Sequence, residues 1–290
     1  LPRHLIITLL GVSVRTPRSR LSKGFSLEKR LIDCEQALEL YPGVWRGKWN
    51  RWGYGKPYQR IILDLGCGKG EYTVACAKLH PDTLFIGLDI EVICAIRGAE
   101  RAIDQKIPNA VFVCAKDPDL TELFAPEELN GILLNFPTPY PKKKRASLRL
   151  TYLDRLITYR DVLAPKASVR LRTDSFPLRD FSLTQLELAG YDLKWKSDDV
   201  RKLFPDEPLS AYEQKLTAQG NTVYGFEAVP GSLPEQIIQT APLSLVSYLP
   251  ENVEDLEYIP HGMQGCVTNM RGRRANRRKK GLSEWTRPII

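Results

Sequence analysis

A glycine loop between two apolar runs is the first place where this sequence could do chemistry. Gly66, Gly68 and Gly70 follow the apolar run 59–65 in a G-x-G-x-G spacing, unlike the G-x-G-x-x-G of dinucleotide-binding loops. Glu71 comes next, at the predicted start of a helix, where its carboxylate would repel a phosphate. A plain tight turn could use the same glycines. The spacing and Glu71 together favour a ligand without phosphate groups.

Two aspartates flank this loop and could hold the rest of such a ligand. Asp64 precedes the loop and could pair with an ammonium group. Asp89 ends the next apolar run, 84–89, and could accept hydrogen bonds from both hydroxyls of a ribose. An ammonium group, a ribose and no phosphate describe S-adenosylmethionine. We therefore predict S-adenosylmethionine as the cofactor of a methyltransferase, whose methyl acceptor these residues leave open.

A proline-rich loop with four consecutive cations is the second such place. Residues 135–145 read NFPTPYPKKKR and follow the predicted strand 131–136. The cations could bind phosphate groups, and Tyr140 could stack on a base. Most charge runs are solvated loops, but this one stands at the carboxyl end of a strand, where ligands of such sheets bind. The loop favours a nucleic acid as methyl acceptor.

The elements that must position these residues alternate along the chain. Apolar runs predict strands, and helical periodicity predicts helices between them. The predicted strands are 59–65, 84–89, 110–115, 131–136, 167–173, 191–196 and 222–228, and the predicted helices are 71–79, 91–106, 149–163 and 178–189. This order predicts an α/β fold: a Rossmann-like, seven-stranded, mostly parallel sheet with helices on both faces.

The excess of positive charge is concentrated at the two ends of the chain. The 290 residues carry 42 Lys and Arg against 34 Asp and Glu, a net charge of +8. Residues 1–30 have a balance of +6 and residues 271–290 of +7, so the rest of the chain is mildly acidic, at −5. Basic ends suggest a polyanionic partner, nucleic acid first, although disordered tails have the same composition. We predict a basic N-terminal arm with an aromatic-rich lead-in (1–58), a methyltransferase domain (59–230) and a C-terminal extension with an arginine-rich tail (231–290).

Composition also disfavours other classes of protein. No stretch reaches the roughly 18 apolar residues of a membrane helix. The six cysteines form no C-x-x-C pair and only three histidines occur, so we predict no metal site and a cytoplasmic protein with reduced thiols. The apolar run 5–12 could pass as a signal peptide, but the basic residues after it suit export poorly. A monomer and a homodimer both stay open.

The proline-rich loop and several distant segments resemble one family. The loop 135–145, followed by Leu150-Thr151-Tyr152, resembles the signature of the bacterial tRNA (guanine-N7)-methyltransferases of the TrmB type. Other segments that resemble this family, in the same order and spacing, are 46–49, 64–70, 87–89, 173–174 and 210–213. The resemblance covers roughly residues 15 to 229.

The resemblance implies a class I S-adenosylmethionine-dependent methyltransferase that modifies N7 of the variable-loop guanine of tRNA, position 46. By position, it implies cofactor binding by Asp64, Gly66, Gly68, Gly70, Asp89 and Asp117. It implies substrate binding by Lys142, Asp174, Ser210, Ala211, Tyr212 and Glu213. The family's catalytic aspartate corresponds to Thr138.

Three departures from the family pattern keep alternatives open. Thr138 lacks the charge of an aspartate, Lys116 replaces an acidic residue next to Asp117, and the basic stretch thins at 146–148. N7 carries a free lone pair, so its attack needs positioning and no general base. We therefore expect activity to survive Thr138. The alternatives are a non-catalytic or impaired tRNA-binding homologue and a methyltransferase of another RNA.

The sequence leaves the roles of two further groups of residues open. The arginine-rich tail 271–280 could clamp RNA or be a disordered solubilising tail. Trp45, Trp49, Trp52 and Tyr54 could stack on RNA, but we expect them to pack the lead-in against the core.

Overall fold

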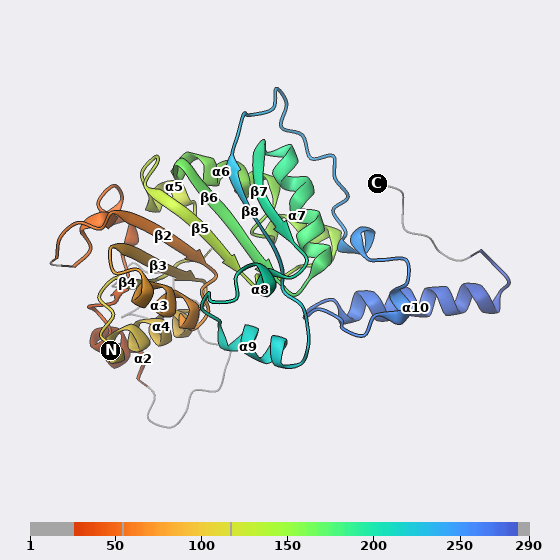
Figure 1. Cartoon of the computed structure of the whole chain (residues 1–290), viewed down its shortest axis with the longest axis horizontal. Coiled ribbons are helices and arrows are strands. Elements are labelled where there is room, and N and C mark those ends of the chain that lie inside the picture. The colour runs from red at the N-terminus through yellow and green to blue at the C-terminus, as the bar shows by residue number, and fades with distance from the viewer. Residues whose placement is uncertain (1–25, 54, 117, 284–290) are drawn as a thin grey trace. The chain divides into compact units, whose positions relative to one another are not determined.

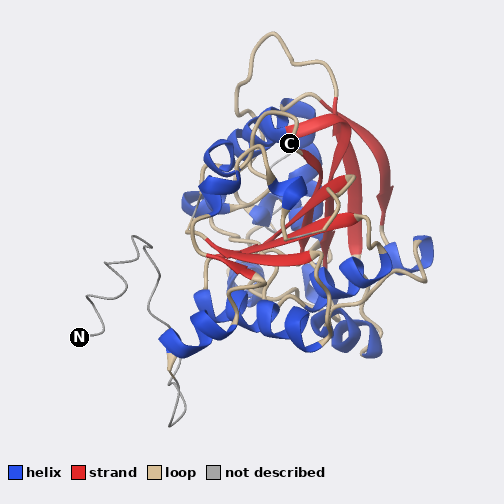
Figure 2. Ribbon diagram, turned by 90° about the vertical axis from the view of Figure 1, so that its left-hand side faces the viewer, coloured by secondary structure: helices blue, strands red, loops and turns tan. Residues whose placement is uncertain are grey.

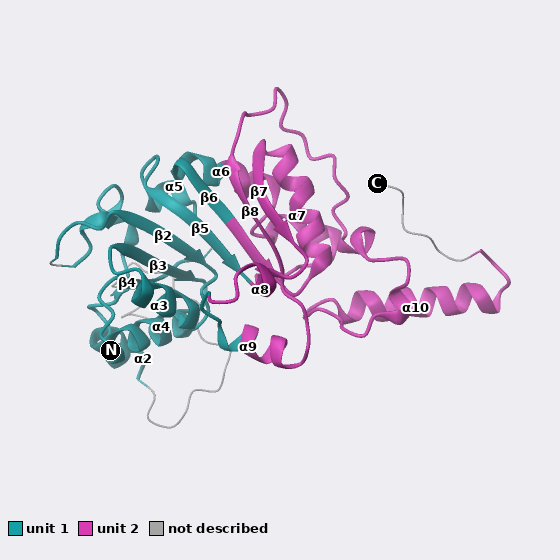
Figure 3. Cartoon of the chain, in the orientation of Figure 1, with its two compact units in different colours: residues 1–135, 158–169, 207–212 teal, residues 136–157, 170–206, 213–290 magenta. Residues whose placement is uncertain are grey.

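The computed structural model describes residues 26–53, 55–116 and 118–283 (Figure 1). The chain forms two compact units, each assembled from separate segments (Figure 3). Unit 1 comprises Leu1–Asn135, Thr158–Val169 and Glu207–Tyr212, and unit 2 comprises Phe136–Ile157, Arg170–Asp206 and Glu213–Ile290. The division at residues 58 and 230 was drawn from composition and stays a prediction.

The strands form one sheet in the order β1-β4-β3-β2-β5-β6-β8-β7. They are β1 (Leu38–Glu39), β2 (Arg60–Leu65), β3 (Thr83–Asp89), β4 (Ala110–Cys114), β5 (Leu129–Asn135), β6 (Leu163–Thr173), β7 (Tyr191–Ser197) and β8 (Tyr224–Pro230). β2 pairs in parallel with β3 and β5, β4 pairs in parallel with β3 and β1, and β7 pairs antiparallel with β8. Helices lie on both sides of the sheet (Figure 2). The predicted α/β fold with a mostly parallel sheet is confirmed.

The sheet has eight strands in the described part of the chain, one more than the seven predicted. The additional strand is β1, in which Leu38 pairs with Phe112 and Glu39 with Val113. A strand of two residues contains no apolar run, so the sequence pattern could not reveal it.

Close packing around Phe112 fixes the end of the glycine loop in unit 1. The helices α3 (Glu71–Leu79) and α4 (Val92–Asp104) share a hydrophobic cluster with this ring. A Cβ atom added at Gly70, Gly87 or Gly98 would lie within 3.0 Å of Phe112 ring atoms. The absence of side chains at these three glycines therefore lets the loop, β3 and α4 approach one another over the ring.

Tryptophan side chains pack the lead-in of unit 1 against the rest of that unit. It contains the helix α2 (Leu27–Asp33) and the short 3-10 helices η1 (Pro42–Trp45) and η2 (Trp49–Arg51). The Trp49 ring is fully buried, and its Nε1 donates to the carbonyl of Leu123 in α5 (Leu120–Leu123) at 2.9 Å. The ring centroids of Trp45, Trp49 and Trp52 lie 4.9–6.1 Å apart. The expected packing role is confirmed for these residues, and Tyr54 lies outside the described residues.

Unit 2 contains the end of β6, the strands β7 and β8, and the extension. Its elements include η3 (Lys143–Leu148), α7 (Phe176–Leu188), α8 (Val200–Leu203), η4 (Leu245–Tyr248), η5 (Val253–Asp255) and α10 (Gln264–Lys279), while α6 (Leu153–Val162) and α9 (Ala211–Ala218) continue from one unit into the other. Leu178 and Phe181 of α7 form a buried cluster with Leu245, Val267 and Met270 of the extension. The described part of the extension is therefore folded, and the alternative of a disordered tail is wrong for α10.

Candidate functional site

The glycine loop and Asp89 are joined by a hydrogen bond in unit 1. Gly66, Gly68 and Gly70 all have positive φ, at 83°, 56° and 70°, a conformation that favours glycine. The backbone N–H groups of Gly68 and Glu91 each donate to a different oxygen of the Asp89 carboxylate, both at 2.9 Å. A Cβ atom at Gly68 would meet nothing within 4 Å, so the loop is open on that side. Asp89 is thus held in a fixed orientation, with lone pairs left to accept further hydrogen bonds.

Asp64 is a buried carboxylate at the end of β2, with 1% of its surface exposed. One oxygen accepts from Thr73 Oγ1 at 2.6 Å and the other from Asn135 Nδ2 at 3.1 Å. Burial raises the pKa of Asp64 to about 6, although both hydrogen bonds oppose that shift. A cationic group beside it would lower this pKa again and stabilise the charge.

The arrangement in unit 1 fits the predicted cofactor. Asp89 offers two oriented carboxylate oxygens to a pair of hydroxyls, the open side of Gly68 leaves room beside it, and Asp64 offers a buried anion to an ammonium group. Lys116 is exposed, and Asp117 lies outside the described residues. The described residues hold no cluster of three or more His, Cys, Asp or Glu that could bind a metal ion.

Glu71 has a role that sequence reasoning missed. Its carboxylate accepts from the backbone N–H of Ala211 at 3.0 Å and pairs with Arg101 at 3.2 Å. It therefore fixes the segment that contains the predicted substrate-binding residues Ser210, Ala211 and Tyr212 close to the start of α3. No sequence spacing indicates this contact, because Glu71 and Ala211 lie 140 residues apart.

The side chain of Arg149 holds the proline-rich loop of unit 2 through hydrogen bonds to the loop's backbone. This fully buried guanidinium donates to the carbonyls of Pro139 at 3.1 Å and Tyr140 at 2.8 Å, and it stacks 4.2 Å from the centroid of the Phe181 ring. Burial lowers the pKa of Arg149 to about 10. Phe136 and Tyr140 have positive φ, at 49° and 43°, which costs non-glycine residues about 1–3 kcal/mol each. Arg149, one of the basic residues that follow the loop in sequence, thus stabilises a strained loop from inside.

Strained backbone of this kind is typical of functional loops. Thr138 is exposed between the two strained positions, and Lys142 follows in the same loop. Gly262 of the extension lies against this loop, because a Cβ atom added there would be 3.4 Å from Pro139 Cγ.

The extension also contacts Asp174, which stands just beyond the end of β6. The Asp174 carboxylate is 6% exposed and accepts from the hydroxyl of Tyr258 and from the backbone N–H of His261, the latter at 3.3 Å. Sequence reasoning placed residues 231–290 outside the methyltransferase domain and missed Tyr258. Its surroundings carry no periodic pattern that could have drawn attention to it.

Glu213 differs from the other predicted substrate-binding residues because it faces arginines. It is 1% exposed and lies 3.7 Å from Arg172 Nη1 and 2.7 Å from Arg201 Nε. Burial raises the pKa of Glu213, and the nearby arginines oppose that shift. The carboxylate therefore anchors α9 to β6 and α8 in unit 2.

The chain is similar to known methyltransferases. A family model described as "Putative methyltransferase" matches residues 58–226. The tRNA (guanine-N(7)-)-methyltransferase of Brevibacillus brevis is 35% identical over 209 residues, which cover 69% of this chain and 96% of that protein. The protein of the same name from Geobacillus kaustophilus is 34% identical over 190 residues, which cover 65% of this chain and 86% of that protein. Among solved structures, the 16S rRNA (adenine(1408)-N(1))-methyltransferase from Catenulisporales acidiphilia has a TM-score of 0.45 and 18% identity, covering 68% of this chain and 96% of that chain.

Proposed function

The chain belongs to the tRNA (guanine-N7)-methyltransferase family, and from this premise we propose that it transfers a methyl group from S-adenosylmethionine to N7 of the variable-loop guanine of tRNA, position 46. The observation that carries the proposal is the group formed by Asp64, Gly68 and Asp89 at the carboxyl ends of β2 and β3. Asp64 offers a carboxylate to the ammonium group of the cofactor, and Asp89 offers two acceptor oxygens to its ribose hydroxyls. The transfer needs no metal.

Each proposed residue has a defined task in this reaction. When bound, S-adenosylmethionine supplies a methyl group that is electrophilic because it is attached to a positively charged sulfur. Asp89 accepts from the ribose hydroxyls, and Asp64 pairs with the ammonium group. Lys142 binds a phosphate of the RNA, Thr138 accepts a hydrogen bond from the guanine edge, and Asp174 offers its carboxylate to the acceptor.

No residue has to remove a proton, because N7 of guanine carries none. The protein contributes mainly by holding N7 in line with the methyl group, and positioning of this kind can contribute about 7–11 kcal/mol. Positive charge moves to the guanine during the transfer, so a carboxylate close to the base would stabilise the transition state. We assign that contribution to Asp174, since Thr138 has no charge. A protein with this activity acts on tRNA in the cytoplasm.

The test is methyl transfer from labelled S-adenosylmethionine to unmodified tRNA transcripts. Chain cleavage at 7-methylguanine would map the modified base, and a transcript with its variable-loop guanine replaced would serve as the control. We expect label in the first transcript only. Label at another guanine in both transcripts would refute position 46 while leaving the reaction class intact.

One observation favours a second candidate function. Thr138 is exposed and uncharged where the family has an aspartate, which suits an impaired homologue that binds tRNA without modifying it. Binding of tRNA without transfer to any transcript would establish this alternative.

A further inference from the structure

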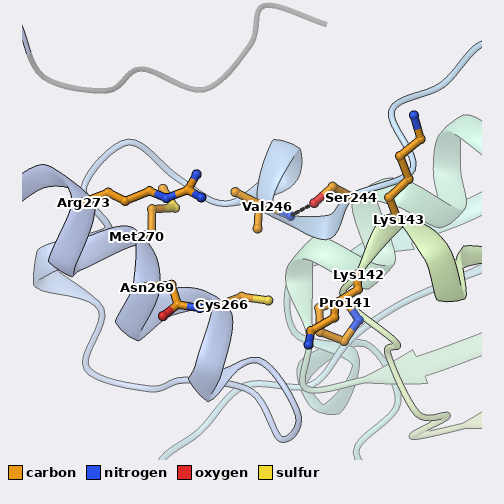
Figure 4. Close-up of a pocket in the computed structure, with 9 residues that line it drawn as sticks. All are labelled: Pro141, Lys142, Lys143, Ser244, Val246, Cys266, Asn269, Met270 and Arg273. Carbon is orange, nitrogen blue, oxygen red and sulfur yellow. Dashed lines mark hydrogen bonds between the residues drawn. The ribbon is translucent and has the colours of Figure 1, made fainter.

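A pocket of about 320 Å³ lies within unit 2, between the proline-rich loop, η4 and α10 (Figure 4). Its floor is largely apolar, formed by Pro141, Val246 and Met270. Lys142, Lys143 and Arg273 contribute the charged groups. The pocket residues of the proline-rich loop lie in the region that the family model matches, 58–226. Those of η4 and α10 lie in the extension, outside that region.

The walls of this pocket are fixed by packing and hydrogen bonding. The backbone N–H of Leu245 donates to the carbonyl of Pro141 at 3.0 Å and joins η4 to the loop. Val267 and Met270 of α10 are buried in the same cluster as Leu245. The pocket is thus formed before any ligand arrives, which lowers the entropic cost of binding.

Three of the five arginines of α10 lie closest to the pocket in sequence, and they have two different roles. Arg271 donates to the carbonyls of Val253, Glu254 and Leu256, and Arg274 pairs with Glu254 at 2.6 Å. These two attach the helix to the segment around η5. Arg273, on a different side of the helix, directs its guanidinium toward η4 over the pocket (Figure 4).

No acidic side chain lines the pocket among the described residues, and within that part of the chain Lys142, Lys143 and Arg273 form no ion pair. Three cations line this apolar floor without an acidic side chain among them, and this excess of positive charge would attract an anion. A nucleotide unit matches this pattern, because its phosphate suits the cations and its sugar or base suits the apolar floor.

We propose that this pocket binds one backbone nucleotide of the tRNA substrate, with Arg273 of the extension as its main phosphate ligand. RNA is the favoured source of the phosphate because Lys142 belongs to the loop that carries Thr138, so the pocket continues the proposed acceptor site. This inference rests on the proposed function. It gives the extension a direct role in binding the substrate.

The first experiment compares tRNA binding by Arg273→Ala and Lys279→Ala. Both variants remove one exposed cation from α10 and introduce a good helix former, but Lys279 does not line the pocket. Filter binding of unmodified tRNA over a salt series, without cofactor, gives both affinity and salt dependence. We expect Arg273→Ala to weaken binding about tenfold at low salt and to reduce the slope of log K against log salt by about one.

Lys279→Ala should change the affinity by less than about threefold, because it removes charge from the same helix without a phosphate contact. Equal losses in the two variants, or no loss in either, would overturn the proposal. A wild-type protein that neither binds nor methylates tRNA would refute the proposed function itself. Normal methylation by the wild type together with unchanged binding by Arg273→Ala would refute this inference alone.

A second experiment uses Cys266, which also lines the pocket, as a reporter. Its alkylation is followed by mass spectrometry, with Cys94 of unit 1 as the internal reference. We expect tRNA to slow alkylation of Cys266 relative to Cys94. Protection by inorganic phosphate but not by tRNA would mean a site for small anions and would contradict the proposal, as would no protection by either.

Discussion

The carboxylate of Asp64 is buried at the end of β2, where side-chain hydrogen bonds from Thr73 and Asn135 partly compensate its lost hydration. Burial raises its pKa from an ordinary value of 3.8 to about 6. A folded state whose acid has a raised pKa binds protons more tightly than the unfolded chain. The stability contribution of this group is therefore fully present below pH 3.8 and is lost as pH rises through about 6.

This shift predicts the behaviour of Asp64→Asn. The uncharged variant should unfold with a higher free energy than the wild type at pH 8, by on the order of 3 kcal/mol. The difference should disappear as pH falls below about 4, while cofactor affinity is lost at every pH. Urea unfolding across this pH range, with calorimetric titration of S-adenosylmethionine, measures both effects. A difference in stability that does not vary with pH would contradict this account of Asp64.

The uncharged Thr138 provides a second test at the level of one residue. Thr138→Asp should increase kcat by about 10- to 100-fold, because a carboxylate would stabilise the positive charge that develops on guanine. Single-turnover methylation of tRNA measures this change. A slower variant would show that the site depends on threonine.

The hydrogen bond between Tyr258 and Asp174 provides a third test at the level of one residue. Tyr258→Phe removes the hydroxyl that donates to Asp174 and keeps the ring packed against the cluster of Val200, Leu216 and Val223. We expect a loss of about 1 kcal/mol of stability and about a tenfold loss in kcat/KM for tRNA. Tyr248→Phe is the matched control, because it removes a hydroxyl that bonds to the Pro242 carbonyl in the same unit. Equal kcat/KM values for the two variants would exclude a positioning role for Tyr258.

At the scale of elements, the close approach of α4 to Phe112 reverses the usual effect of a glycine substitution. Alanine normally stabilises a helix relative to glycine by about 1 kcal/mol. Gly98→Ala should instead destabilise unit 1 by about 1–3 kcal/mol, since the new Cβ atom would overlap the ring. Gly272→Ala in α10, where a Cβ atom meets nothing within 4 Å, should raise stability. Chemical unfolding of both variants checks the signs, and a gain at Gly98 would refute the packing argument.

The elements that the sequence predicted well are those with continuous apolar runs. β2 to β5 are buried on both faces, so Ile61–Leu63 and similar runs mark them directly. α6 starts at Leu153 rather than at 149, because Arg149 leaves the helical pattern to hold the proline-rich loop. The glycine loop, Asp64 and Asp89 came together as expected because parallel strands bring their carboxyl ends to one edge.

At the scale of the whole molecule, removal of residues 231–290 tests whether the extension is part of the fold. Leu178 and Phe181 of α7 lose their buried partners in this truncation. Exposure of these two side chains should lower the free energy of unfolding by about 3–6 kcal/mol. Thermal unfolding of the full chain and of the truncated chain measures this loss. An unchanged melting temperature would mean that the extension is a separate appendage.

The extension is the region for which the sequence was least informative. Its apolar residues, such as Leu245, Val253, Met263 and Val267, follow no single period, because they reach one buried cluster from short 3-10 turns, loops and a helix. Basic residues dominated the composition of its last part and suggested solvent exposure. Two of them, Arg271 and Arg274, serve instead to hold backbone carbonyls. Packing between residues that are far apart in the chain produces no local sequence pattern.

The hydrogen bond from Tyr258 to Asp174 has a consequence for how this protein can evolve. A carboxylate that is 6% exposed loses the hydrogen bonds from Tyr258 and His261 when the extension is lost, and a hydrogen bond to a charged group contributes about 1.5–3 kcal/mol. A deletion of this segment therefore costs stability at Asp174, and a prior change at Asp174 that removes the need for these donors would lower that cost. The segment is in that sense easier to keep than to discard.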